Sequence, residues 1–302
     1  MRRMSTTRFL KTNFGVCRVD VKDDIETNIH TRNNLVTGKL IAVGGKHTCV
    51  FIKTSTYSNK ANLHNVKTSA CGCEVNHKKI LGENTVRMVK LAFTIVKEVA
   101  PHVKMLELDD TSAFECKLED GRSFGISIAL YELAFHQATW YERHFDAKLI
   151  TEEANQAYIQ AKEGFHTPKP EQFDFLNNSL NQLLWPMYAS TKTWKDFFAK
   201  IYNIEKKCRI MFPWYMRAVA SAMGGMACGN QTRIIDIYSP TNESIPYTEV
   251  QKEIRGGTRK IKNVYMDYGE PIDYILESFH HIPNEDIRNI KFTKHDLCPD
   301  SL

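Results

Sequence analysis

The sequence lacks any long hydrophobic run. No stretch approaches the roughly 18 apolar residues that a membrane-spanning helix requires. The N-terminal stretch 1–8 is basic, but it lacks the apolar region of a secretory signal. These two absences argue against a membrane protein and against a secreted one, and they predict a cytoplasmic location.

The sequence also lacks a strong charge of one sign. The net charge is +5 over 302 residues, which is too small by itself to indicate nucleic-acid binding. A mildly basic protein would suit an acidic ligand such as a nucleotide carrier. Internal repeats and low-complexity tracts are absent as well, and 42% apolar with 25% charged residues is ordinary globular composition.

Closely spaced cysteines are almost missing. Eight cysteines are spread along the chain, and only Cys71 and Cys73 stand close together, with His77 nearby. Structural zinc sites favour two to four residues between paired cysteines and need a second ligand pair, which does not follow here. We therefore predict free thiols in a reducing compartment and no metal site.

The stretch 62–150 is the most informative part of the chain. Its pattern predicts a strand, a glycine turn at Gly82, a long helix beginning with Thr85 as its N-cap and ending before Pro101, and a strand at 103–108. The two strands should be neighbours in one sheet. A second helix at 127–145 and a short strand near Lys148 follow. This order predicts an α/β fold with a mixed sheet flanked by helices.

The two ends of the chain have different patterns. Residues 8–57 read as strands, with a hairpin predicted around Gly44-Gly45-Lys46. Residues 151–163 predict a polar helix, and 166–170 reads as a linker. We predict an α/β domain at 1–164 and a mostly helical domain of unknown role at 165–302. The expected core anchors of the second domain are Trp185, Trp194 and Trp214.

The turn before the long helix could hold a phosphate group. Backbone N–H groups point outward at a helix N-terminus, and the helix dipole adds about half a positive charge there. Lys79 lies beside Gly82 in this turn, while the Glu83 carboxylate would repel phosphate unless it points to solvent. The alternative interpretation is a plain tight turn followed by an ordinary helix cap.

These elements resemble the GNAT-type N-acetyltransferases, a family that binds the coenzyme A pyrophosphate on a Gln/Arg-x-x-Gly-x-Gly/Ala turn. The matching positions run from Lys79 to Asn84, and only Gly82 agrees outright. The segment Trp140-Tyr141-Glu142-Arg143-His144-Phe145 is similar to a second motif of that family. The resemblance covers about 90 residues of the chain.

The resemblance implies a GNAT-like fold, acetyl-CoA as cosubstrate and an amine as acceptor. It implies that Tyr141 protonates the departing thiolate and that a carboxylate or a water acts as base. Glu74 is the predicted base, with Glu107 and Asp109 as alternatives. The implied cofactor-binding residues are Lys79, Gly82, Glu83, Asn84 and Thr85.

A second hypothesis is a non-enzymatic binding or structural module on a degenerate acyltransferase fold. The segments 106–112 and 139–142 also resemble uncharacterised proteins of large DNA viruses, which would place the protein in the host cytoplasm or the virion. The basic run 255–262 would then serve as a surface for a protein partner. Nucleic acid is a weaker alternative at that run, because Tyr265 and Tyr268 lie nearby and could stack on bases.

Overall fold

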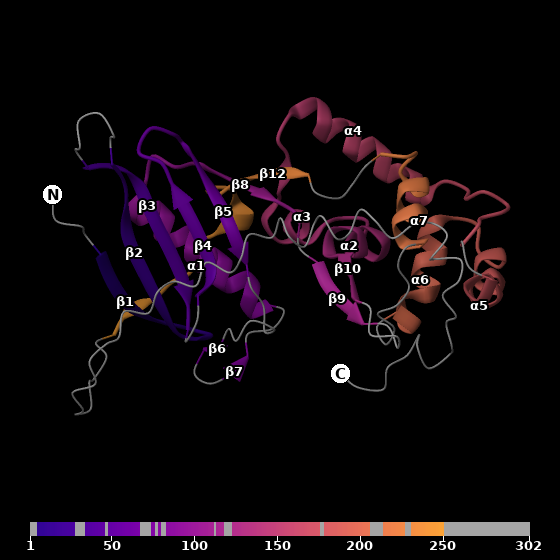
Figure 1. Ribbon diagram of the computed structural model, residues 1–302, viewed down its shortest axis with the longest axis horizontal. Coiled ribbons are helices and arrows are strands. Elements are labelled where there is room, and N and C mark those ends of the chain that lie inside the picture. The colour runs from indigo at the N-terminus through magenta and orange to yellow at the C-terminus, as the bar shows by residue number, and fades with distance from the viewer. Residues whose placement is uncertain are drawn as a thin grey trace. The chain divides into compact units, whose positions relative to one another are not determined.

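The computed structural model describes residues 5–27, 34–45, 48–66, 74–75, 78–79, 83–111, 113–117, 123–175, 178–205, 214–226 and 231–250. They form two compact units (Figure 1). The first unit holds the described residues of 1–109, 141–150 and 232–258, and the second holds those of 110–140 and 151–231. Each unit is built from separate segments, unlike the predicted contiguous domains divided at residue 164. That division stays a prediction.

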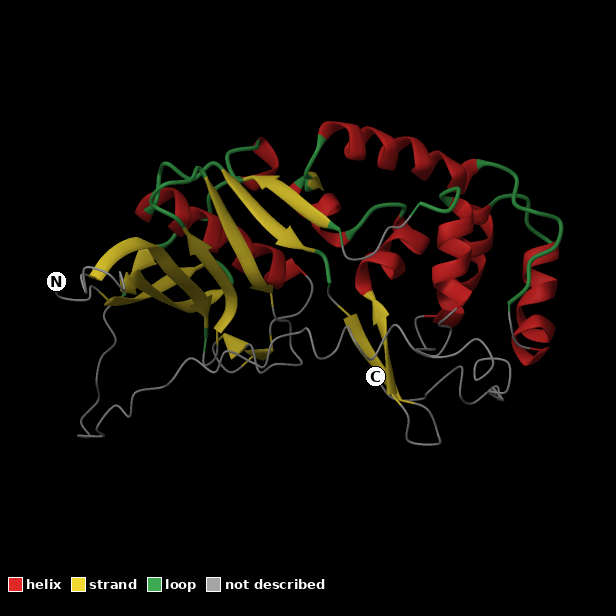
Figure 2. Cartoon of the chain, turned by 45° about the horizontal axis from the view of Figure 1, so that its top comes forward, coloured by secondary structure: helices red, strands yellow, loops and turns green. Residues whose placement is uncertain are grey.

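A nine-stranded sheet dominates the first unit (Figure 2), and it confirms the predicted α/β class with a mixed sheet. All neighbours in it are antiparallel except β5 and β8. In spatial order its strands are β11 (Lys148–Leu149), β12 (Thr232–Asp236), β8 (Met105–Asp109), β5 (Lys60–Val66), β4 (Thr48–Thr54), β3 (Asn34–Gly44), β2 (Gly15–Thr27), β1 (Ser5–Thr12) and β13 (Thr248–Glu249).

One face of this sheet forms the core of the unit. Apolar residues alternate along the strands, so cross-strand partners such as Val43 and Val50, or Ile41 and Ile52, are buried together. The β3–β4 pairing confirms the hairpin predicted from the sequence. Helix α1 (Glu83–Val99) packs on β3 and β4.

Helix α1 confirms the predicted long helix. Its residues at helical spacing, Met88, Val89, Ala92, Phe93, Ile95 and Val96, are all buried. The predicted N-cap is wrong, because the helix begins at Glu83 and Thr85 is its third residue. The helix ends at Val99, two residues before Pro101, whose ring restricts the residue before it.

The crossover around α1 differs from the prediction in its first strand. We expected the strand directly before Gly82 to neighbour the strand at 103–108. Strand β7 (Lys78–Lys79) instead pairs with β6 (Glu74–Val75) in a separate two-stranded sheet. The parallel neighbour of β8 is β5, which comes earlier in the chain. The prediction is therefore wrong for β7, and β5 takes that place.

The helix predicted at 127–145 is two helices. Helix α2 (Ile128–His136) ends where Gln137 adopts a left-handed conformation with φ of 52°, and α3 (Trp140–Phe145) follows. A left-handed residue terminates a helix whether or not it is glycine. Helix α2 belongs to the second unit, and α3 belongs to the first unit from Tyr141 onwards. In the first unit, Phe145 of α3 packs edge-to-face on Phe93 of α1 at 5.5 Å.

The second unit is mainly helical in its described part. Besides α2 and the hairpin of β9 (Ala113–Lys117) and β10 (Ser123–Ser127), it contains α4 (Glu152–Lys162), a 3-10 turn (Glu163–His166), α5 (Asn178–Ala189), α6 (Trp194–Glu205) and α7 (Trp214–Ala222). Aromatic rings fill its core, and Trp194 and Trp214 are buried as predicted. Trp185 is 40% exposed, so its assignment as a core anchor is wrong.

The segment 240–250, which we call the strap, crosses α1 and is hydrogen-bonded to it. Asn242 is fully buried and donates to the carbonyl oxygens of Phe145 and Asp236. Lys97 of α1 donates to the Asn242 carbonyl oxygen at 2.9 Å. The backbone N–H of Ile245 donates to the Thr94 hydroxyl, also at 2.9 Å.

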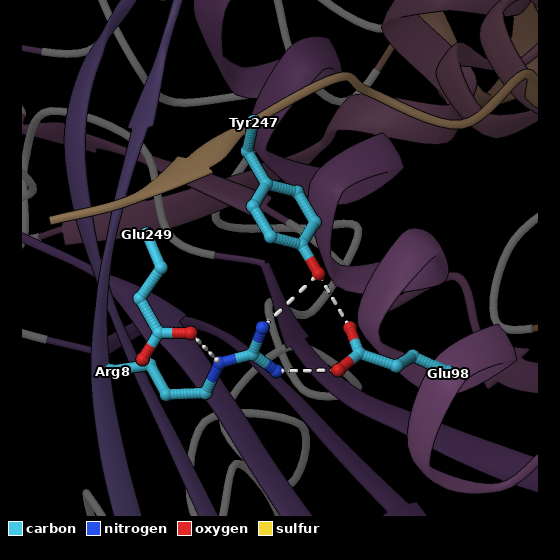
Figure 3. A network of polar contacts seen from close by, with 4 residues as sticks. All are labelled: Arg8, Glu98, Tyr247 and Glu249. Carbon is cyan, nitrogen blue, oxygen red and sulfur yellow. Dashed lines mark hydrogen bonds and ion pairs between the residues drawn. The ribbon is translucent and has the colours of Figure 1, made fainter.

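A polar network holds the far end of the strap (Figure 3). Arg8 of β1 donates to Glu98 of α1 at 2.7 Å, to Glu249 at 3.2 Å and to the Tyr247 hydroxyl at 3.1 Å. The Tyr247 hydroxyl donates to the second Glu98 oxygen at 2.5 Å. The network thus joins the sheet edge, the helix and the strap.

The close approach of Gly164 to α7 yields a stability prediction. A Cβ atom there would lie 1.7 Å from the Ala222 carbonyl oxygen. We expect Gly164→Ala to destabilise the protein by about 1–3 kcal/mol through overpacking, which outweighs the smaller gain from a stiffer unfolded chain. Urea unfolding measures this. Glu171→Ala, in an exposed loop, is the control, and equal midpoints for both variants would contradict the predicted contact.

The Glu98 network makes stability depend on pH. Burial opposes ionisation of Glu98, but the hydrogen bonds from Tyr247 and Arg8 outweigh it and hold the pKa of Glu98 below its ordinary value. A carboxylate with a lowered folded pKa stabilises the fold above its unfolded pKa, and this contribution is lost as the pH falls through the folded pKa.

We therefore expect Glu98→Gln to cost up to about 1 kcal/mol at pH 7, since the pair is partly exposed. The cost should shrink towards zero at an acidic pH below the folded pKa of Glu98, where the wild-type carboxyl is protonated as well. Urea unfolding at both pH values measures the difference, with Glu243→Gln on the exposed part of the strap as control. A cost that is the same at both pH values would rule out the ionised network as its source.

Candidate functional site

Strands β5 and β8, the only parallel pair in the described sheet, are hydrogen-bonded to each other over only part of their length. Three residue pairs form the β5–β8 ladder: Lys60 with Met105, Ala61 with Leu106, and Asn62 with Glu107. Both strands continue past the last pair, β5 to Val66 and β8 to Asp109. Their carboxyl ends therefore run on without pairing to each other. Ligands of open α/β sheets bind at this end of the parallel strands.

The N-terminus of α1 comes to the same end of the sheet. At the other end, His102 beyond α1 contacts the Ser55 carbonyl oxygen at 2.7 Å, and the Lys104 N–H donates to the Asn59 carbonyl oxygen at 2.7 Å. These contacts place the C-terminus of α1 beside the start of β5. A helix of 17 residues spans about 25 Å at 1.5 Å per residue, close to the length of β5.

Thr85 in the first turn of α1 has an unusual environment. Its side chain is 3% exposed, and its hydroxyl makes no hydrogen bond in the described part of the chain. A buried hydroxyl without a partner costs free energy, so it is expected to meet a partner in some state of the protein. Positioned at a helix N-terminus, such a hydroxyl can donate to an anion.

The sheet face away from α1 is polar beside the unpaired strand ends. The Lys60 ammonium contacts the Glu107 carboxylate at 2.6 Å. The Thr232 hydroxyl of β12 donates to the Asp109 carboxylate at 2.7 Å. Neighbouring strands thus hold both acidic side chains of β8 in fixed positions.

A β-bulge interrupts β5 at this point. Leu63 lies opposite Ile52, and Asn65 lies opposite Phe51, so His64 is an extra residue between them. The His64 ring lies 5.8 Å from the Phe51 ring and remains exposed to solvent. Bulges of this kind redirect a side chain and are frequent beside active sites.

The environment of His64 favours its neutral form. Partial burial, followed by the Lys53 ammonium, lowers the pKa of His64 below its ordinary value, and Asp109 opposes the shift. The imidazole is therefore mostly neutral at neutral pH and can accept a proton.

The residues predicted for the cofactor lie at the start of α1 or outside the described part. Glu74 of β6 and Lys79 of β7 are cross-strand partners in the small sheet. Gly82 lies outside the described residues. Glu83 and Asn84 begin α1, directly before Thr85. Of this set the structure brings Glu83, Asn84 and Thr85 together, and it brings Glu74 to Lys79.

Tyr141 lies at the start of α3 and is 7% exposed. Its ring lies 6.3 Å from that of Phe145, which packs on Phe93 of α1. Its carbonyl oxygen accepts from the Ala147 N–H at the end of the helix. The Tyr141 side chain is therefore buried against Phe145 of its own helix, and Phe145 packs on α1.

The sequence interpretation missed His64 and Thr232. Glu107 and Asp109 were candidate bases because they end a predicted strand. Thr232 follows Asp109 by 123 residues, and only the sheet order brings the two together. The remaining signal for His64 was its position in the strand that precedes the long helix.

Cysteine and metal chemistry is limited in the described part. Cys49 forms a disulfide, so the prediction of a free thiol is wrong there. Cys17 is a free thiol, and burial raises its pKa to about 12, which leaves it unreactive at neutral pH. The segment around Cys71, Cys73 and His77 lies outside the described residues. Within them, no group of three or more His, Cys, Asp or Glu side chains could hold a metal ion.

No helix in the described ranges is long and apolar enough to cross a membrane. No protein-family model matches the sequence, and neither a curated protein nor a solved structure gave a match. The function is therefore argued from the geometry of the site.

Proposed function

We propose that the protein is an acyltransferase of the GNAT type that moves an acetyl group from acetyl-CoA to an amine. The observation that carries the proposal is the β5–α1–β8 crossover, whose strands pair over three residues and then continue unpaired. It supplies a strand, a long helix and a parallel strand, although the small sheet of β6 and β7 comes between β5 and α1 in the sequence. The unpaired strand ends offer backbone donors and acceptors to an extended, amide-containing arm such as that of coenzyme A.

The pyrophosphate of the carrier would lie at the N-terminus of α1. Backbone amides of 82–85 would donate to its oxygens, and Lys79 would contribute a positive charge. The buried Thr85 hydroxyl supports this placement, because it has no hydrogen-bond partner among the described residues. In this proposal the phosphate is the missing acceptor.

The chemistry would take place between the strand ends. The amine nitrogen attacks the thioester carbonyl carbon, the C–S bond breaks, and the departing thiolate takes up a proton. Tyr141 is the proposed donor of that proton, as the resemblance implies. Acidic residues on β8 would favour a positively charged amine substrate near the unpaired ends of β5 and β8.

One observation favours the alternative, a non-enzymatic binding or structural module. Tyr141 is buried beside Phe145 in the packing of α3 on α1, which is the environment of a structural aromatic residue. A module of this kind would retain the crossover for stability and would not bind acetyl-CoA. The basic run 255–262, which would be its partner surface, lies outside the described residues.

Coenzyme A binding tests the proposal through Thr85→Val, which keeps the shape of the side chain and removes the hydroxyl. We expect calorimetry to show acetyl-CoA affinity lowered about 10- to 100-fold, the value of a hydrogen bond to a charged group. The free protein should be as stable as wild type or more so, because the lost hydroxyl had no partner among the described residues.

Thr94→Val is the matched control on the same helix. Its hydroxyl bonds to Lys90 and to the strap, so this change should lower stability and leave acetyl-CoA affinity unchanged. Absence of acetyl-CoA binding by the wild type at millimolar ligand would end the proposal.

The role of Tyr141 is tested by Tyr141→Phe. A general acid contributes about 10²- to 10⁴-fold to the rate, so the variant should lose at least about tenfold in turnover while it keeps its acetyl-CoA affinity. Tyr158→Phe, at a buried tyrosine of the second unit, is the control and should keep its turnover. Wild-type turnover in Tyr141→Phe would reduce Tyr141 to a packing residue.

A further inference from the structure

His64 and Asp109 both lie on the unpaired part of the β5–β8 pair. The last ladder pair is Asn62 with Glu107, and His64 and Asp109 each lie two residues further along the same strands. Asp109 faces the side of the sheet that carries Glu107, because strand side chains repeat every second residue. The bulge breaks this repeat in β5, but the His64 ring contacts the ring of Phe51, which lies on the same face of β4 as Lys53, the cross-strand partner of Asn62. The electrostatic effect of Asp109 on His64 agrees with this placement.

The two residues are held by different means. The bulge and the Phe51 ring orient His64 from the β4 side. The Thr232 hydroxyl fixes the Asp109 carboxylate from the β12 side, at 2.7 Å. Asp109 makes no hydrogen bond or ion pair to His64 in the described part of the chain and acts on it only electrostatically, by favouring the imidazolium that forms when His64 accepts a proton.

We propose that His64 is the general base of the site, that the Asp109 carboxylate stabilises its protonated form, and that the substrate is a primary amine that arrives as an ammonium ion. This inference rests on the proposed acyl transfer. Glu74, the base predicted from the sequence, lies on a strand of the small sheet, whereas His64 lies on β5 at the unpaired end of the β5–β8 pair.

The amine nitrogen loses two protons in this reaction. His64 takes the first from the ammonium ion and leaves a neutral amine with a free electron pair. That pair forms the N–C bond to the thioester carbonyl carbon, and the electrons of the C–S bond leave with sulfur. Tyr141 gives its proton to the thiolate and regains one as nitrogen loses its second proton. The proton on His64 is released to water.

Charged groups on both neighbouring strands act on His64. Lys53 of β4 lies in an ion pair with Asp24 at 3.0 Å and disfavours the imidazolium. On β8, Asp109 favours it, while Glu107 is engaged by Lys60 at 2.6 Å.

The first experiment needs no activity. In an NMR titration of the histidine rings of the full chain, the pKa of His64 should fall further in Asp109→Asn, which loses the stabilising carboxylate. It should rise in Lys53→Met, which loses the opposing ammonium. Glu243→Gln, on the strap, is the control and should not change it. If Asp109→Asn leaves the pKa of His64 unchanged, Asp109 does not act on His64 and the inference is overturned.

The second experiment measures turnover of acetyl-CoA with a panel of primary amines between pH 5 and pH 9. We expect kcat/KM of the wild type to rise with pH through a pKa below about 6.5, the ordinary value for histidine. His64→Gln should lose about 10²- to 10⁴-fold in kcat/KM together with this limb. Its acetyl-CoA affinity, measured by thermal shift, should be unchanged.

The outcomes separate the two proposals. If His64→Gln turns over like the wild type and its kcat/KM still rises with pH in the same way, the inference fails and the acyltransferase proposal stands. If the wild type neither binds acetyl-CoA nor acetylates any amine, both fail. Loss of acetyl-CoA binding in His64→Gln would show that the residue supports the carrier site and would overturn its role as base.

Discussion

The parallel pairing of β5 and β8 is the constraint on which the first unit depends. Two parallel strands cannot be joined by a tight turn, so the chain must leave the sheet and return through a helix. That helix is α1, and its apolar residues cover the apolar face of β3 and β4. A ladder of three residue pairs supplies little stability by itself, because each backbone hydrogen bond contributes only about 1 kcal/mol net. The antiparallel pairing of β5 with β4 and of β8 with β12 therefore holds the two strands in place, and the strap fastens α1 to the sheet edge through Asn242, Tyr247 and Arg8.

The same constraint explains why a site forms at one end of the pair. Each strand is secured on its outer side: β4 pairs with β5, and β12 pairs with β8 along its whole length. The strand ends are thus held in place although they do not pair with each other. Side chains on them are positioned by regular elements, which gives more precise geometry than a loop. His64 and Asp109 differ in this respect from Gly82 of the predicted phosphate turn, which lies outside the described part.

Local pattern predicted local structure well, and long-range order poorly. The 3.6-residue period of α1, the glycine turn of the β3–β4 hairpin and the polar helix α4 were all predictable, because each depends on neighbours in sequence. The break at Gln137 was not, since a left-handed glutamine has no composition signal. The insertion of β12 between β8 and β11 was hidden as well, because the second-unit residues 151–231 separate it from both strands. For that reason Thr232 could not be connected to Asp109 from the sequence.

The distribution of charge at the unpaired ends of β5 and β8 determines which charged ligands could bind there. Lys60 is paired with Glu107, and Lys53 with Asp24, so these four charges largely cancel. Asp109 instead accepts from the neutral hydroxyl of Thr232, which orients the carboxylate without neutralising it. A neutral His64 beside it leaves a net negative charge on the open face. The positive end of the α1 dipole comes to the same sheet end from the other face. Under the proposed function, an anionic carrier would be drawn to the helix N-terminus and a cationic amine to the acidic face of the strands.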